Sequence, residues 1–341
     1  MLKKVVVIVT VLLISTAGVA GCCTVFTASV GDTVLFGNNE DWPDTNTRVW
    51  FLPATETEYG GVYFGFSDFY AQGGMNDQGL CFDANAIPET RMKPHPEKLL
   101  VLNFGRRILQ QCATVEEAIQ IIERYDLSGL GKAQFLFADK TGDSMAVCPG
   151  PHGEMEVVRK EGVYQVTTNF NVLNPWLGGY PCWRYNAAAG MLRKIENEND
   201  LTVEYFASIL KAVYQRHTTY STIYDPVNRI VYVYNQRNFD EVVVLNLEDE
   251  LEKGYHAYYI PLLFPRKQSD QELGEPEAEA EEQKPEEQEP EEPPKEEQKS
   301  EITTEDSHPA ESVSFSDLLY LLSAIVLIGI GLAALLWKKR T

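Results

Sequence analysis

Two stretches near the start of the chain carry its strongest signal: Cys22-Cys23-Thr24-Val25-Phe26 and Gly37-Asn38-Asn39-Glu40-Asp41-Trp42. The first lies where a secretory signal peptide would end. A cysteine that becomes the first residue of a mature chain has a free α-amine with a pKa of about 8, which can take up the thiol proton at neutral pH. Cys23 would then carry a nucleophile and its base in one residue.

Residues 1–22 have the pattern of a signal peptide, followed by residues that would be removed during processing. Lys3 and Lys4 precede an apolar run at 5–14 that is too short to span a bilayer, and small residues follow at 17–21. We therefore expect export and a mature chain that begins at Cys23. An alternative stays open, because residues 19–22 also fit a lipoprotein cleavage box, and a lipidated Cys22 would leave Cys23 inside the chain.

The C-terminal part of the sequence predicts a membrane anchor. Residues 318–336 contain no charged side chain, and a stretch of this length can cross about 30 Å of hydrocarbon. Trp337 and the basic cluster at 338–340 follow, a pattern typical of the cytoplasmic side. We expect a transmembrane helix at 316–337 and a cytoplasmic tail at 338–341. The protein would be a single-pass protein of the cell membrane, with its folded body outside the cell.

Most of the negative charge lies in one segment, a predicted stalk at residues 267–315. Between 268 and 312 there are eighteen acidic residues and three lysines, which give −15 of the chain's net charge of −21. A segment so charged and so poor in apolar side chains is expected to stay extended and disordered. The rest of the chain then carries a net charge of only −6, so most of the acidity lies outside the folded body and indicates no cationic ligand.

The remaining residues, 23–266, are long enough for one domain with a large core. Short β-rich runs bounded by turns predict strands at 24–29, 33–37, 48–52, 61–66, 80–83, 133–139, 144–147, 155–159, 164–168, 220–224, 230–235 and 241–247. Helical periodicity and a capping box predict helices at 99–111, 114–125, 183–196 and 203–214. Strands and helices that fall in separate groups favour an α+β fold with antiparallel sheets.

Three further motifs accompany the two opening stretches: Gly74-Met75-Asn76-Asp77-Gln78-Gly79-Leu80, Thr168-Asn169, and Cys182-Trp183-Arg184-Tyr185-Asn186-Ala187-Ala188. In this order, and behind an N-terminal cysteine, the set resembles the choloylglycine hydrolase and penicillin V acylase family of N-terminal-nucleophile (Ntn) hydrolases. The resemblance implies a four-layer αββα sandwich with antiparallel sheets. It also implies hydrolysis of linear amides without a cofactor or a metal ion.

The resemblance further implies a set of catalytic residues: Cys23, Asp41, Asn85, Asn169 and Arg184. Cys23 would attack the amide carbonyl, Asp41 would hold the α-ammonium over the sulfur, and the side chain of Asn85 or Asn169 would meet the oxyanion. Arg184 would lie beside the nucleophile.

Supporting or substrate-binding roles are implied for three neighbours on the second motif: Asn38, Asn39 and Trp42. The chain departs from the family at one of them. Asn38 stands where the family often has an arginine, and a neutral amide cannot stabilise a thiolate by charge. Activation of the sulfur would then depend more on Arg184, Asp41 and the α-amine.

Other kinds of site lack support in the sequence. The five histidines show no metal-ligand spacing, and there is no glycine-rich phosphate loop, nucleophile-elbow serine or basic stripe for nucleic acid. The aromatic residues at 63–66 and 69–70 fit either a core strand or an acyl pocket. In an oxidising exterior, four cysteines, Cys81, Cys112, Cys148 and Cys182, allow two disulfides in any of three pairings.

Taken together, the sequence predicts an extracellular, membrane-tethered Ntn hydrolase that cleaves a linear, non-peptide C–N amide of an acylated small molecule. Two alternatives stay open. The first is a cysteine dipeptidase of the same superfamily, whose sequence can also begin with Cys-Thr and continue with Arg-Asn-Glu-Asp. The second is a surface binding protein that keeps the scaffold without the catalysis.

Overall fold

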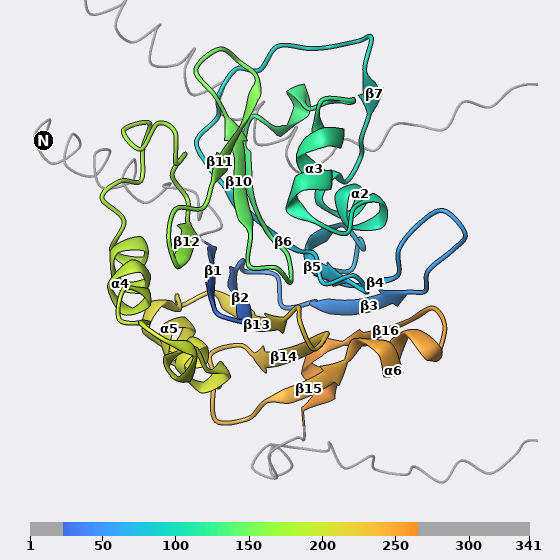
Figure 1. Ribbon diagram of the computed structural model, residues 1–341, viewed down its shortest axis with the longest axis vertical. Helices are drawn as coiled ribbons and strands as arrows, with labels where there is room; N and C mark the ends of the chain where they lie inside the picture. The colour runs from blue at the N-terminus through green and yellow to red at the C-terminus, as the bar shows by residue number, and fades with distance from the viewer. Residues whose placement is uncertain (1–22, 265–341) are drawn as a thin grey trace, which may run out of the picture. The chain divides into compact units, whose positions relative to one another are not determined.

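A computed structural model describes residues 23–264, and these build two stacked β-sheets with helices on both outer faces (Figure 1). The predicted signal peptide, stalk, membrane helix and cytoplasmic tail lie outside the described residues. Within 23–264, no helix has the length and apolar character needed to span a membrane.

The first sheet has six strands in the order β12-β1-β2-β13-β14-β15, all paired antiparallel. Its strands are β1 (Thr24–Val30), β2 (Thr33–Asp41), β12 (Tyr164–Thr167), β13 (Thr218–Asp225), β14 (Ile230–Asn235) and β15 (Val243–Asn246). Gly31 adopts φ +56° in the turn between β1 and β2, a conformation that favours glycine. This tight hairpin sets the register, and it lays the start of β1 against the end of β2.

The second sheet has eight strands in the order β11-β10-β9-β6-β5-β4-β3-β16, again antiparallel throughout. Its strands are β3 (Arg48–Leu52), β4 (Gly61–Gly65), β5 (Ala71–Asn76), β6 (Cys81–Ala86), β9 (Ala133–Ala138), β10 (Ser144–Pro149), β11 (Met155–Arg159) and β16 (His256–Tyr259). Two short strands, β7 (Leu99–Leu100) and β8 (Tyr125–Asp126), form a separate parallel pair.

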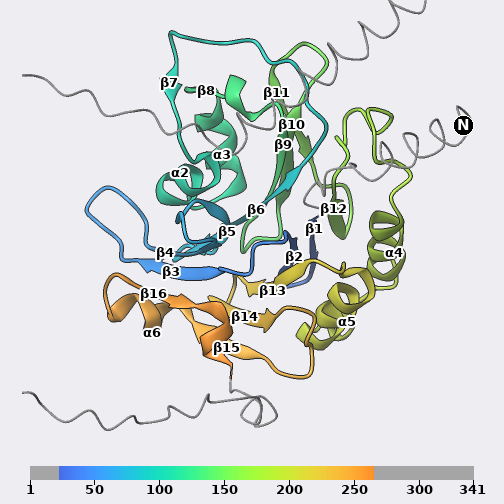
Figure 2. The same cartoon turned by 180° about the vertical axis from the view of Figure 1, so that it is seen from behind.

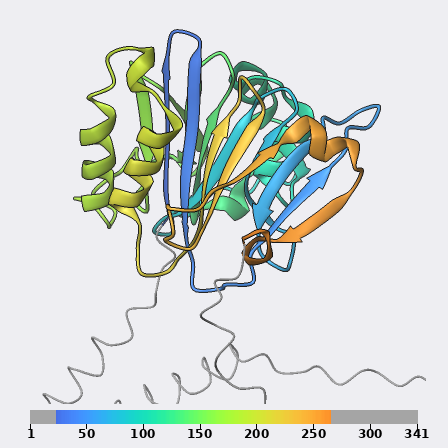
Figure 3. The same cartoon turned by 90° about the horizontal axis from the view of Figure 1, so that it is seen from below.

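Helices cover the outer face of each sheet (Figures 1 and 2). The helices are α2 (Phe104–Gln111), α3 (Val115–Ile122), α4 (Trp183–Leu192), α5 (Val203–Val213) and α6 (Leu247–Glu252), with 3-10 turns η1 (Ser128–Leu130), η2 (Glu198–Asp200) and η3 (Ile260–Leu263). The pair α4 and α5 packs on the six-stranded sheet, and the pair α2 and α3 packs on the eight-stranded sheet. Figure 3 shows α4 and α5 flanking the strands of their sheet.

A buried apolar core fills the space between the sheets. Tyr220 of β13 packs there against Phe64 of β4 from the opposite sheet, and Phe36 of β2 belongs to the same cluster. The order of layers is therefore helix, sheet, sheet, helix, and the expected αββα fold with antiparallel sheets is confirmed.

The local expectations differ from the structure at identifiable points. The helix expected at 99–111 begins only at Phe104, because the Asn103 side chain accepts a hydrogen bond from the Arg106 N–H and caps it. Strand β5 was not expected, since its glycines obscure the β pattern. Gly73 is needed there because a Cβ would overlap the Asp83 carboxylate. The strand β16 and the short helix α6 were also not expected.

The possible disulfides are absent from the described part of the chain. Cys81, Cys112, Cys148 and Cys182 are all buried and free. The cysteine count allowed two pairs, but the fold places these side chains in the core as single thiols.

Candidate active site

Cys23 directly precedes β1, the second strand of the six-stranded sheet. Because Thr24 pairs with Asn39 across the hairpin, the cysteine lies beside the last residues of β2. Its side chain is buried, and the thiol donates a hydrogen bond to Oε1 of Glu40 over 3.4 Å. The two stretches that stand out in the sequence are thus joined at one point by the pairing of β1 with β2.

Arg184 connects the start of the chain to two other expected site residues. It lies in the first turn of α4 and is 4% exposed. Nη1 donates to the Cys23 carbonyl oxygen and to Thr24 Oγ1, each over 2.7 Å, and Nη2 donates to Asn169 Oδ1 over 2.8 Å. Nη1 also lies 3.9 Å from Asp41 Oδ2. The guanidinium on α4 therefore fixes the backbone of Cys23.

Asn169 links the two sheets next to this arginine. Its Nδ2 donates to the backbone carbonyl oxygen of Ala86, at the end of β6, over 2.7 Å. Both ends of the amide are therefore engaged in positioning contacts, one with Arg184 and one with the eight-stranded sheet.

Asp41 is buried at the end of β2, on the strand face that points to the helices. Thr218 Oγ1 donates a short hydrogen bond to its Oδ1. Burial raises the pKa of Asp41 to about 7, against the opposing effects of this hydrogen bond and of Arg184. The carboxyl group therefore changes its charge near neutral pH, and the nearest cation is the guanidinium of Arg184.

Two further buried acids, Glu40 and Asp83, lie near the sulfur on the side that faces the other sheet. Neither was among the expected site residues. Burial, reinforced by the charge of Asp41, raises the pKa of Glu40 to about 8, and burial with the charge of Glu40 raises the pKa of Asp83 well above its usual value. The sequence holds a signal for Glu40, because side chains alternate between the two faces of a strand. Asn38 and Glu40 of β2 therefore share the face that points to the opposite sheet.

Asn38 occupies the position where the resembling family often has an arginine, and its partner is an acid. Its Nδ2 donates a short hydrogen bond to Asp83 Oδ2 on β6. The side chain is fully buried. Asn38 therefore connects β2 of one sheet to β6 of the other, and it supplies no positive charge.

Asn39 points to the other face of β2 and does not line the cavity. Its Nδ2 donates to the carbonyl oxygen of Leu210 on α5 over 3.0 Å, and Ser221 Oγ donates to its Oδ1 over 2.6 Å. Of the two neighbouring asparagines, Asn39 is the one that connects β2 to helix α5.

The thiol of Cys23 is held in its neutral form. Burial raises its pKa well above the usual value, and the charges of Glu40, Asp41 and Asp83 raise it further, while a backbone hydrogen bond from Asp41 opposes them. A neutral thiol would need a proton acceptor in order to act as a nucleophile.

The sulfur opens into a cavity of about 390 Å³ between the ends of the two sheets. Its lining includes Cys23, Glu40, Trp42, Phe66, Asn85 and Lys132. Asn85 is 1% exposed, and neither its Nδ2 nor its Oδ1 has a hydrogen-bond partner within residues 23–264. A buried amide without a partner in a cavity beside a sulfur can receive an oxygen atom of a substrate.

The aromatic stretch of β4 divides between the two expected environments. Tyr63 and Phe64 are buried in the core, whereas Phe66 lines the cavity. Phe69 and Tyr70 are partly exposed. Tyr63 and Phe64 are thus core-strand residues, and Phe66, which follows the strand, is a pocket residue.

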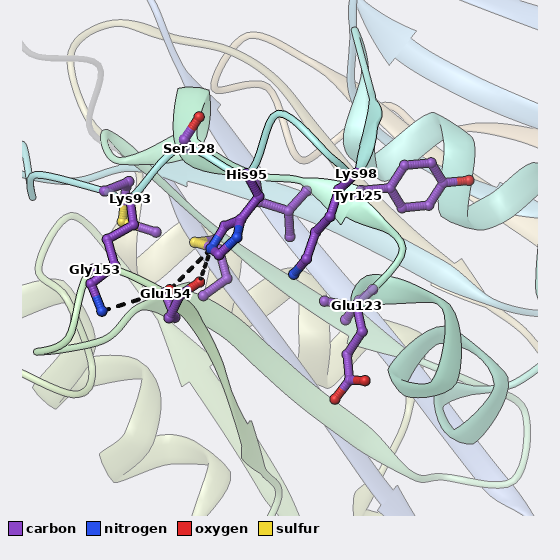
Figure 4. A pocket seen from close by; sticks show the side chains of 12 residues that line it. Lys93, His95, Lys98, Glu123, Tyr125, Ser128, Gly153 and Glu154 are labelled. Carbon is purple, nitrogen blue, oxygen red and sulfur yellow. Dashed lines mark hydrogen bonds and ion pairs between the residues drawn. The ribbon is translucent and has the colours of Figure 1, made fainter.

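A second pocket, of about 330 Å³, lies away from all the expected site residues (Figure 4). Figure 4 shows His95 pointing to Glu154, with Lys93 and Lys98 nearby. This second pocket is lined by both basic and acidic side chains, whose charges largely compensate each other. Within residues 23–264, no group of three His, Cys, Asp or Glu side chains is arranged to hold a metal ion.

Comparisons with known proteins agree with this geometry. Residues 29–238 match the model of the family "Acyl-coenzyme A:6-aminopenicillanic acid acyl-transferase". The fold is similar to that of penicillin V acylase from Agrobacterium tumefaciens, with 19% identity, a TM-score of 0.55, and coverage of 68% of this chain and 89% of that one. It is also similar to a mutant conjugated bile acid hydrolase from Clostridium perfringens, with 18% identity, a TM-score of 0.57, and coverage of 69% and 96%. A search among curated proteins gave no match.

Proposed function

The chain belongs to the family of acyl-coenzyme A:6-aminopenicillanic acid acyl-transferases, and from this membership and the place of Cys23 in the cavity we propose that Cys23 is its nucleophile. Family and fold make it an enzyme of the Ntn class that acts on non-peptide C–N bonds of linear amides. The proposed substrate is an acylated small molecule, and the product of the first step is a thioester on Cys23. The observation that carries this proposal is the cavity in which the Cys23 sulfur and the unpartnered amide of Asn85 lie together.

The proposed first step is attack of the sulfur on the amide carbonyl. The carbonyl oxygen gains negative charge as the C–S bond forms, and the Nδ2 of Asn85, which has no other partner in the described residues, would donate a hydrogen bond to it. In the mature chain the α-amine of Cys23 takes up the thiol proton as the sulfur attacks, and the resulting α-ammonium gives that proton to the leaving amine as the C–N bond breaks. The neutral α-amine then takes a proton from the water that hydrolyses the thioester.

Arg184 and Asp41 support this chemistry without touching the substrate carbonyl. Arg184 holds the Cys23 carbonyl group, which fixes the backbone that carries both the sulfur and the amine. Asp41, next to Arg184, provides a buried carboxyl group at the position expected for an acceptor of the α-ammonium. Positioning of this kind lowers the entropic barrier to attack.

The cavity favours an acyl group with an apolar part. Trp42 and Phe66 form its apolar wall, whereas Asp44, Asp68 and Lys132 place charges on its lining. An acyl chain can pack on the aromatic rings while the amine portion of the substrate meets the polar side chains.

We further propose that the enzyme works outside the cell, tethered by its C-terminal segment. The support is in the sequence: an apolar stretch at 318–336, a basic cluster at 338–340, and an N-terminal region with the pattern of a secretory signal.

The function is tested on a panel of substrates with the purified mature protein. Amides of aryloxyacetic, fatty and steroid acids should release amine and acid, and Cys23→Ala should release neither. Dipeptides serve as the competing class, because hydrolysis of dipeptides alone would assign a dipeptidase. Tight binding of an acyl amide without turnover would assign a binding protein on this scaffold.

A further inference from the structure

We propose that the segment at residues 170–183, which leads from β12 into α4, is a docking surface for a lipid bilayer. We name this segment the aromatic loop. It runs along the outside of the molecule (Figure 1). The inference goes beyond the proposed amidase and does not depend on its chemistry.

The aromatic loop exposes several large apolar side chains to solvent. Trp176 is 81% exposed and Trp183 is 56% exposed. Leu173, Leu177 and Tyr180 are each 38–39% exposed. Exposed apolar residues are ordinary when they are scattered singly, whereas a group of them on one segment marks an interaction surface.

The composition of the aromatic loop fits a lipid surface. No charged residue lies between Glu161 and Arg184, although charged residues make up 23% of the chain. Tryptophan and tyrosine favour the boundary of a membrane, because the ring packs among acyl chains while its N–H or hydroxyl group stays hydrated. We therefore expect docking on a neutral bilayer, with little dependence on salt.

Hydrogen bonds within the protein hold the aromatic loop in shape. The N–H groups of Asn174 and Leu177 donate to the carbonyl oxygens of Asn171 and Asn174, each over 3.0 Å. The Asn171 side chain donates to the Pro149 carbonyl oxygen over 2.7 Å and accepts from the Leu173 N–H over 2.9 Å. Because these polar groups are already paired, moving them from water to a membrane surface costs less free energy.

A chain of ring contacts anchors the exposed part of the loop to the protein. The rings of Trp176 and Tyr180 lie 5.7 Å apart, and those of Tyr180 and Phe170 lie 5.2 Å apart. Phe170 is buried. The inner end of this chain is therefore fixed, and the outer ring, Trp176, remains available to a partner.

The size of the surface favours a bilayer over a second copy of the chain. The five exposed side chains present on the order of 500 Å². A stable protein interface buries about 800 Å² on each partner. A bilayer does not require that area from one loop, because the proposed C-terminal tether already keeps the body beside the membrane.

Both ends of the aromatic loop are connected to the candidate site. Just before the loop, Asn169 donates to the carbonyl oxygen of Ala86, a residue that lines the cavity. Just after it, Arg184 donates to the carbonyl oxygen of Cys23. Docking would therefore hold the candidate site close to the membrane surface, where molecules with long acyl chains collect.

The test is the tryptophan fluorescence of the processed full-length protein in vesicles of neutral phosphatidylcholine. Trp337→Phe serves as the parent, because it removes the tryptophan next to the predicted membrane helix. The vesicles contain either ordinary lipid or the same lipid with brominated acyl chains, which quench a tryptophan that contacts them. Emission should be lower by roughly a third in the brominated lipid, since two of the four remaining tryptophans lie on the loop.

Three variants of this parent identify the surface that contacts lipid. Trp176→Phe combined with Trp183→Phe keeps the surface apolar but removes both reporters, so its emission should be equal in the two lipids. Trp176→Ser removes the most exposed ring, and the quenching of Trp183 should fall about twofold because docking is weaker. Tyr255→Ser is the matched control, an exposed aromatic residue outside the loop, and should keep the quenching of the parent. Melting temperatures should stay close to that of the parent, since the serine variants change exposed side chains.

Several results would overturn the inference. The parent could fail to float with the vesicles, or its emission could be equal in the two lipids. Quenching that persists in the double phenylalanine variant would place another face on the bilayer. A dimer in sedimentation, with Trp176 shielded from acrylamide before lipid is added, would assign the surface to a second copy. None of these measurements reads amide cleavage, so a failure of the proposed amidase would leave the result on docking unchanged.

Discussion

Arg184 donates a hydrogen bond over 2.7 Å to the carbonyl oxygen of Cys23, although 161 positions separate the two residues. The contact joins the first turn of α4 to the start of β1. It fixes the backbone that carries the proposed nucleophile, and the same guanidinium holds Thr24 and Asn169. A planar group with several donors is needed for three acceptors at once.

Arg184→Lys should therefore lower activity although it keeps the charge. An ammonium cannot reproduce the contacts to Cys23, Thr24 and Asn169 together. A displacement of the sulfur by about 1 Å is expected to cost on the order of 100-fold in kcat. Steady-state kinetics on an acyl amide measures this loss. A lysine variant with wild-type kcat would show that the arginine contacts do not position the nucleophile.

The two asparagines Asn85 and Asn39 should respond in opposite ways to replacement by alanine. Asn85→Ala should reduce kcat by about 10²–10³-fold, because a donor to the oxyanion is lost, with little change in melting temperature. Asn39→Ala removes hydrogen bonds to Leu210 and Ser221 and should cost about 1–3 kcal/mol of stability. Kinetics and thermal unfolding of both variants separate the roles. Loss of stability without loss of kcat in Asn85→Ala would remove it from the site.

Stability should fall as pH rises from about 4.5 to 8. Glu40, Asp41 and Asp83 have folded pKa values above their usual ones, so the folded state binds more protons than the unfolded chain in this range. The stabilisation is complete below the unfolded pKa values and is lost as pH rises through the folded values. Urea unfolding at several pH values measures it, and Glu40→Gln should flatten the curve. Stability that increases over this range would contradict the raised values.

The membrane tether predicts a simple result on whole cells. Protease should cut the acidic segment at 268–312, because its composition offers no apolar surface for packing, and should release an active body into the medium. Activity is measured in the supernatant and on the washed cells. Activity that stays on the cells after cleavage of this segment would require another attachment, such as a lipidated Cys22.

Much of this site was predictable because it depends on local sequence. The pairing of Thr24 with Asn39 follows from a hairpin of two regular strands, and it brings the N-terminal cysteine to Asp41. The partners of Asn38 and Glu40 were not predictable. They depend on which residue of β6 faces β2 across the sheets, and strand β5, which places β6, is obscured in the sequence by Gly73 and Gly74.

The central claim is that Cys23, as the first residue of the mature chain, forms a thioester with the acyl group. The most direct measurement quenches the processed enzyme in acid during turnover and determines the mass of the peptide that begins at Cys23. This peptide should carry the added mass of the acyl group, and the corresponding peptide of Cys23→Ala should not. Turnover of amides with an unmodified Cys23 peptide, or with the acyl group on another residue, would contradict it.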